Sequence, residues 1–185
     1  RPAADASNPW LWLGLIALYV LAHHTVFEAA TGSAVPTQPI LVAMVLTMPV
    51  QLVPAALLAA ALIAGVVGRG VGPPGYRVAV ESMSAWHAFG PAVVLLVATM
   101  TTPSLAHWHL YGVALLAQFA VDALVAAIRT RALGAPLREL VAPMGWTFAV
   151  DAMLAPVGLA AVIAAGQSPA LLILLAAPLG LIRLL

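Results

Sequence analysis

The chain has no cysteine and no lysine, and only 7% of its 185 residues are charged. The lack of cysteine excludes a disulfide framework, a thiolate metal site and a cysteine nucleophile. The low charge separates the chain from soluble domains, in which about 25% of the residues are charged. Instead, 64% of the residues are hydrophobic and the mean hydropathy is +1.09. Apolar runs near the roughly 20 residues that cross a bilayer recur along the whole length, so we expect an integral membrane protein in contact with lipid throughout.

Catalytic motifs are also missing from the sequence. It has no nucleophile-and-base spacing and no pair of catalytic carboxylates. The stretch GVGPPG at 70–75 reads as a turn, because a phosphate-binding loop needs a preceding strand and a following helix. We therefore expect no enzyme activity in this chain itself, and no nucleic-acid partner.

The apolar segments predict an all-α, polytopic bundle of about six transmembrane helices. Asn8-Pro9 and the aromatic residues Trp10 and Trp12 mark the start of the first helix. Pro49 and Pro54 interrupt the second, because each removes a backbone donor and clashes with the preceding turn. The predicted spans are residues 10–30, 39–68, 87–102, 105–128, 143–165 and 169–183.

The proline-broken block 39–68 has two possible courses: one broken crossing of the membrane, or a hairpin of two short helices. One crossing places all the arginines on one side, whereas we expect a hairpin to scatter them. The positive-inside rule then places both termini in the cytoplasm of a cell-membrane protein. We therefore predict one crossing, with the freed backbone of 49–54 buried in protein or lining a cavity. We also expect a cytoplasmic output domain to follow residue 185.

Five ionisable residues are predicted near the extracytoplasmic boundary, in the first and fourth spans. His24 and Glu28 are four residues apart, which places them on one face of a helix. One interpretation is ordinary helix-end polarity that binds nothing. A second is a cavity that opens outward and holds a small molecule through His24, Glu28, Gln51, His107 and His109. A third is a metal or haem site at His23, His24, His107 and His109, since neutral imidazole is the commonest metal ligand.

A second group of polar residues is predicted towards the cytoplasm. Asp122 and Asp151 lie on consecutive spans, each about 10–12 Å inside the membrane at 1.5 Å per residue. Gln118 precedes Asp122 by one turn, and His87 begins the third span on the same side. A charged group in lipid costs roughly 2.5–3.5 kcal/mol, so we expect both carboxyl groups to face the interior, near each other or near Gln118 and His87. They serve either interhelical hydrogen bonding or proton or ion transport.

Four segments carry a resemblance to a known family: SAVPTQPILVAMVLTMPVQLVPAALLAA, SAWHAFGPAVVL, LYGVALLAQFAVDALVAAIR and GWTFAVDAMLAPVGLAA. Together they resemble the N-terminal membrane region of actinobacterial signalling proteins that continue into an HD-type phosphohydrolase (HD-GYP-like) or a GGDEF diguanylate cyclase domain. The resemblance implies membrane anchoring and signal input for cyclic-di-GMP turnover by an attached cytoplasmic domain, and is compatible with a homodimer. The family's catalytic signatures have no counterpart in this chain.

Two other classes stay open. Six short spans with a broken second helix also resemble the vitamin-binding components of energy-coupling transporters, at the level of fold alone. A membrane protein that binds a metal ion or haem through the histidines is the other alternative. Apart from such a metal or haem, the sequence indicates no cofactor.

Overall fold

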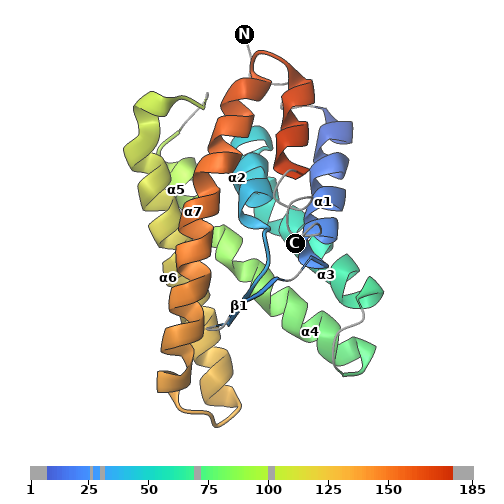
Figure 1. The fold of residues 1–185 in the computed structure, drawn as a ribbon, viewed down its shortest axis with the longest axis vertical. Coiled ribbons are helices and arrows are strands. Elements are labelled where there is room, and N and C mark those ends of the chain that lie inside the picture. The colour runs from blue at the N-terminus through green and yellow to red at the C-terminus, as the bar shows by residue number, and fades with distance from the viewer. Residues whose placement is uncertain (1–7, 26, 30–31, 69–71, 100–102, 177–185) are drawn as a thin grey trace.

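The computed structural model describes residues 8–25, 27–29, 32–68, 72–99 and 103–176, which form a helical bundle with one short hairpin (Figure 1). The helices are α1 (Pro9–His23), α2 (Gln38–Thr47), α3 (Val53–Val67), α4 (Pro74–Ser84), α5 (Phe89–Val97), α6 (Trp108–Ala132) and α7 (Val141–Ala165). Short 3-10 helices are η1 (Val50–Leu52), η2 (Ala85–Ala88), η3 (Leu105–His107), η4 (Leu137–Leu140) and η5 (Pro169–Ala176). The antiparallel hairpin consists of β1 (Phe27–Ala29) and β2 (Gly32–Ala34).

Four helical stretches are long and apolar enough to cross a membrane. They are Val50–Val67, Gly75–Val97, Leu105–Ala132 and Leu137–Ala165. The all-α class and the membrane character predicted from composition are therefore confirmed at this level. The helices α1 and α2 are apolar too, but shorter, with 15 and 10 residues.

The third predicted span, 87–102, has the wrong bounds. The helical stretch begins at α4, passes through η2 and ends with α5 at Val97. The sequence RGVGPPGYR suggested a loop, but Pro74 occupies the first turn of α4. A backbone N–H in this turn has no partner within the helix, so a proline is tolerated there. Charged residues on α4 interrupted the apolar run that was used to find the span. Of the last predicted span, 169–183, residues 169–176 form η5 and the remainder lies outside the described residues.

The first predicted span, 10–30, is also too long. Its start is as expected, because the Asn8 side chain accepts a hydrogen bond from the backbone N–H of Trp10 at 3.0 Å. The helix α1 ends at His23, and the Leu21 carbonyl accepts from the His24 N–H at 3.3 Å and from the Thr25 hydroxyl at 3.2 Å. Glu28 lies in β1 and not on a helix, so the helical face expected for His24 and Glu28 is not formed.

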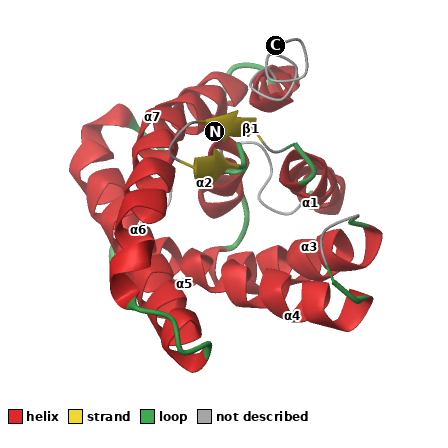
Figure 2. Cartoon of the chain, turned by 60° about the horizontal axis from the view of Figure 1, so that its bottom comes forward, coloured by secondary structure: helices red, strands yellow, loops and turns green. Residues whose placement is uncertain are grey.

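The break between Pro49 and Pro54 is confirmed. The helix α2 ends at Thr47, Met48 is extended with ψ of 159°, and the turn η1 leads into α3. Pro54 falls in the first turn of α3, where it frees no carbonyl. The short helix α2 lies in the middle of the bundle, surrounded by the other helices (Figure 2). Eight of its ten residues are buried.

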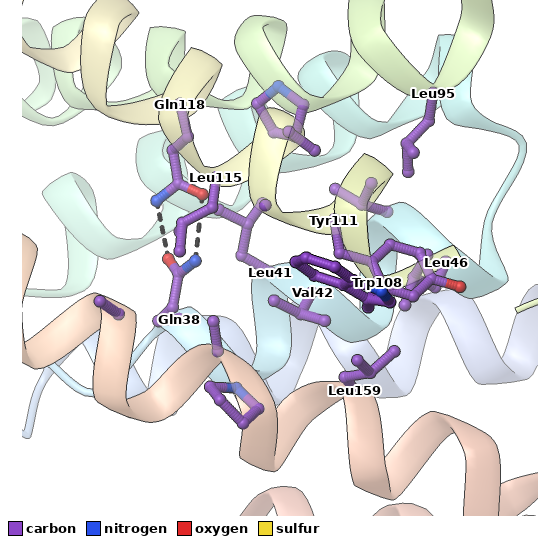
Figure 3. A pocket seen from close by; sticks show the side chains of 17 residues that line it. Gln38, Leu41, Val42, Leu46, Leu95, Trp108, Tyr111, Leu115, Gln118 and Leu159 are labelled. Carbon is purple, nitrogen blue, oxygen red and sulfur yellow. Dashed lines mark hydrogen bonds between the residues drawn. The ribbon is translucent and has the colours of Figure 1, made fainter. Parts of the chain in front are cut away.

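The chain changes direction at this break, so α2 and α3 do not follow one line as a single broken helix over 39–68 would. The helix α2 runs antiparallel to α6, with Gln38 beside Gln118 and Leu46 beside Trp108 (Figure 3). The helix α3 runs antiparallel to α4, because the Arg77 Nε donates to the Gly65 carbonyl at 3.2 Å. Figure 2 shows α3 and α4 side by side, with α5 continuing from α4. An extended residue and a 3-10 turn between two prolines allow this change of direction.

The ends of α1 and α3 consequently lie together. A Cβ atom placed on Gly68 would lie 3.3 Å from His24 Cε1. The next helix reaches the same place, because His23 Nε2 lies 2.6 Å from a carboxylate oxygen of Glu81 on α4. Residues 24, 68 and 81 are therefore at one end of the bundle, although a single crossing by 39–68 would separate the first two.

Candidate functional site

A cavity of about 230 Å³ lies between α2, α5, α6 and α7 (Figure 3). Each of these four helices presents one face to the cavity. On α6 this face has the spacing of three and four residues that brings side chains onto one side of a helix. The residues that form the wall are Gln38, Leu41, Val42, Val45 and Leu46 of α2, Pro91 and Leu95 of α5, Trp108, Tyr111, Gly112, Ala114, Leu115 and Gln118 of α6, and Ala152, Ala155, Pro156 and Leu159 of α7.

Two close helix pairs create the space for this cavity. In one pair, a Cβ atom on Gly90 of α5 would lie 2.4 Å from the carbonyl oxygen of Ala117 on α6. In the other, a Cβ atom on Gly158 of α7 would lie 2.5 Å from the carbonyl oxygen of Pro39 on α2. Glycine thus permits the backbones to approach closely within each pair. The two pairs stand further apart from each other, which leaves a gap between them.

The helices α6 and α7 also meet beyond the cavity. The rings of Phe119 and Phe148 stack there, with centroids 4.4 Å apart and an angle of 15° between their planes. This contact lies next to Gln118 along α6, and neither phenylalanine lines the cavity.

The polar end of the cavity consists of two amides that bond to each other. Gln38 Nε2 donates to Gln118 Oε1 at 3.1 Å, and Gln118 Nε2 donates to Gln38 Oε1 at 2.7 Å. Both residues are deeply buried, with 2% and 5% of their surface exposed. Each amide uses one N–H and one lone pair in this exchange and keeps one of each for another partner.

The α7 wall contributes a second polar feature, which belongs to the backbone. Pro156 lies inside α7 and has no N–H to donate to the carbonyl of Ala152, four residues earlier. Both residues line the cavity. Because helix carbonyls point along the axis towards the residue four positions on, the Ala152 carbonyl lies on the same face as the cavity.

The cavity opens sideways between α6 and α7. Trp108, Gly112, Ala152 and Pro156 line it and are also exposed at the bundle surface, Trp108 at 72%. Tyr111 is held in place beside the opening, because its hydroxyl donates to the Ser104 carbonyl at 3.0 Å and accepts from the Ser104 N–H at 2.9 Å.

The chemistry of the wall favours a neutral, mainly apolar ligand. Among the described residues that line the cavity none is charged, and the polar atoms are the two glutamine amides, the Tyr111 hydroxyl, the Trp108 indole N–H and backbone groups. A charged ligand would lose its hydration without gaining an opposite charge. An apolar molecule meets leucine, valine and alanine side chains on three sides.

The predicted outer site is not assembled by this fold. His24 is at the end of the bundle where α3 ends and α4 begins. His107 and His109 begin α6, which runs antiparallel to α5 and therefore starts at the opposite end. Gln51 is exposed in η1 at that opposite end, and the side chain of Glu28 lies outside the described part of the structure.

The four histidines proposed for a metal ion or haem are divided in the same way. His23 pairs with Glu81 at one end, whereas the Nδ1 atom of His107 is buried without a hydrogen-bond partner at the other. Among the described residues no group of three His, Cys, Asp or Glu side chains could hold a metal ion. The histidines were assigned to one level by counting residues along continuous spans. This count does not hold in the structure, because α1 and α3 end at the same end of the bundle.

The inner polar residues do not form one hydrogen-bonded group in the described part of the structure. Gln118 bonds to Gln38, and His87 Nδ1 lies 2.5 Å from the Ser84 carbonyl oxygen. Asp122 and Asp151 are half-buried on α6 and α7. Asp122 lies within electrostatic range of both His87 and Asp151.

Sequence reasoning identified Gln118 but missed Gln38, Pro156 and the cavity itself. Gln38 was placed just outside the second span, next to a proline, and no local pattern connects it with a residue 80 positions later. Pro156 was the available signal, since a proline within an apolar helix always raises the question of what satisfies the freed carbonyl.

Comparison of the chain with protein-family models, curated proteins and solved structures found no match. The geometry of the cavity therefore carries the functional argument.

Proposed function

We propose that this chain is a membrane-embedded sensory domain that binds a small neutral molecule dissolved in the bilayer. The observation that carries the proposal is the cavity between α2, α5, α6 and α7, with its apolar wall and single polar end. Its volume of about 230 Å³ exceeds the roughly 150 Å³ of an engineered protein cavity that binds benzene. A molecule of one or two rings fits such a space.

A ligand in this position would touch both helix pairs at once. It would contact α5 and α6 on one side and α2 and α7 on the other, and so favour one spacing of the two pairs. A ligand shifts a conformational equilibrium only through such differential contacts. In this proposal the change in helix spacing moves the connection between α6 and α7. This movement is then transmitted to an attached cytoplasmic domain. The resemblance noted above suggests that this domain makes or degrades cyclic-di-GMP.

The direction of signalling rests on a proposed orientation. The end of the bundle that holds His24 and Glu81 also holds Arg77, and Arg129 and Arg131 at the end of α6. The positive-inside rule assigns this end to the cytoplasm. The start of α1 then lies on the extracytoplasmic side, in place of the cytoplasmic N-terminus that we expected. With 10 residues, or roughly 15 Å, α2 is too short to cross a hydrocarbon core of about 30 Å, so we place it as a re-entrant helix.

The binding proposal is tested by filling the cavity with a side chain. Leu115 lines it, whereas Leu116 is the next residue of α6 and faces outward with 67% of its surface exposed. We expect indole to raise the melting temperature of the purified protein in detergent, by the linkage between ligand binding and stability. The same indole concentration should have no effect on Leu115→Trp and an unchanged effect on Leu116→Trp.

The matched pair separates cavity binding from partition into the detergent or onto the lipid-facing surface. An equal shift in both variants, or no shift in the wild-type protein with indole, indene or naphthalene, would show that the cavity does not bind ligands of this class. In the full-length protein, Leu115→Trp should also abolish the response of the output domain to indole.

A further inference from the structure

We propose that the cavity selects ligands that carry a hydrogen-bond donor, and that the Ala152 carbonyl accepts this hydrogen bond. The inference rests on the proposed function and specifies its ligand class. The ligand would be a neutral molecule of one or two rings with an N–H or O–H group on its edge.

The first step of the argument concerns the hydrogen bonds of α7. In a regular helix the carbonyl of residue 152 accepts from the N–H of residue 156, but that position is Pro156. The carbonyl loses this helical donor in the middle of a 25-residue helix. Hydrocarbon offers no donor in its place, so an unsatisfied backbone group there is costly. A donor on the ligand would remove that cost.

The second step concerns the side-chain acceptors of the cavity, which already have partners. The side-chain oxygens of Gln38 and Gln118 each accept from the other amide, and the hydroxyl of Tyr111 both donates to and accepts from Ser104. These groups can accept a further bond from the ligand but do not need one. The Ala152 carbonyl is the acceptor whose partner is missing from the helix itself.

The third step concerns size and charge. The cavity takes a molecule somewhat larger than benzene, and its described lining includes no charged side chain. The opening between α6 and α7 passes Ala152 and Pro156, so a ligand that enters from the lipid meets the free carbonyl at the opening. An acyl chain could enter by the same route but has no donor to offer.

The experiment compares ligands of nearly equal shape that differ in the donor. Dissociation constants of indole, N-methylindole and indene are measured by calorimetry on the purified full-length chain in nanodiscs. We expect indole to bind roughly three- to tenfold more tightly than indene, the range of one net hydrogen bond. N-methylindole should behave like indene. This comparison needs no variant, and equal affinities for all three would overturn the inference while leaving the proposed function in place.

A variant then identifies the acceptor. Pro156→Ala supplies the missing backbone N–H, which would bond to the Ala152 carbonyl and remove it from the ligand. The preference for indole over indene should fall to about onefold. Pro143→Ala is the matched control, because Pro143 lies in the first turn of α7 and outside the cavity lining; it should keep the preference. A preference that survives in Pro156→Ala would show that another group accepts the bond. Failure of all three probes to bind, with lipid retained in the cavity, would overturn the proposed function as well.

Discussion

Gln38 and Gln118 are eighty positions apart in the chain, and their buried amides form two hydrogen bonds to each other. The pair connects the start of the central helix α2 to the middle of α6, and it closes one end of the cavity. In a hydrocarbon environment an amide without a partner is costly, so each glutamine depends on the other. The relationship explains why a polar residue at each position is compatible with a bundle that is otherwise so apolar.

The glutamine pair predicts an asymmetry between single and double variants. Gln118→Leu should lower the free energy of unfolding by about 1–3 kcal/mol, because it leaves the Gln38 amide buried and unpaired. The double variant Gln38→Leu/Gln118→Leu should recover most of this loss, since no polar group is then left without a partner. The measurement is reversible unfolding in detergent mixtures. A double variant whose loss equals the sum of the two single losses would show that the amides act independently.

The close contact between α7 and α2 predicts a second matched comparison. A Cβ atom on Gly158 would lie 2.5 Å from the carbonyl oxygen of Pro39 and 2.8 Å from the Cα of Pro39. These are backbone atoms, which cannot rotate away as a side chain can. Gly158→Ala should therefore destabilise the protein by about 1–3 kcal/mol, as overpacking does. Gly145→Ala on the same helix meets nothing within 4 Å and should be neutral or stabilising by up to about 1 kcal/mol. Thermal unfolding of both variants tests this; similar stability for the two would disprove the contact.

The course of residues 39–68 in the structure predicts which positions share a side of the membrane. The chain lacks cysteine, so single cysteines can be labelled cleanly with an impermeant maleimide in intact cells. His24→Cys and Pro73→Cys should be protected together, because α1 and α3 end at the same end of the bundle. Gln51→Cys and Gln167→Cys, both exposed at the opposite end, should react. Labelling of only one of positions 24 and 73 would contradict this prediction and support a single broken crossing by residues 39–68.

The sequence contained the information for the environment of the chain and for its local breaks. Hydropathy is a property of a window of residues, so the membrane character of the chain could be recognised from the sequence, although the stretch Gly75–Val97 was placed at 87–102. The break after Thr47 was also predictable, because the effect of a proline on a helix is confined to one turn. The start of α1 followed from Asn8-Pro9 for the same reason.

The direction of the chain after each break depended on packing between distant segments. Pro49 and Pro54 require an interruption but are equally compatible with a continued or a reversed course. The observed course is stabilised by contacts such as Gly158 with Pro39 and Gln38 with Gln118, which join residues far apart in sequence. The histidines were assigned to one site from a count of depth that assumed a continued course. Tertiary structure alone decided that they separate and that a cavity forms at Pro156, because the space between two helices is determined by the side chains of both.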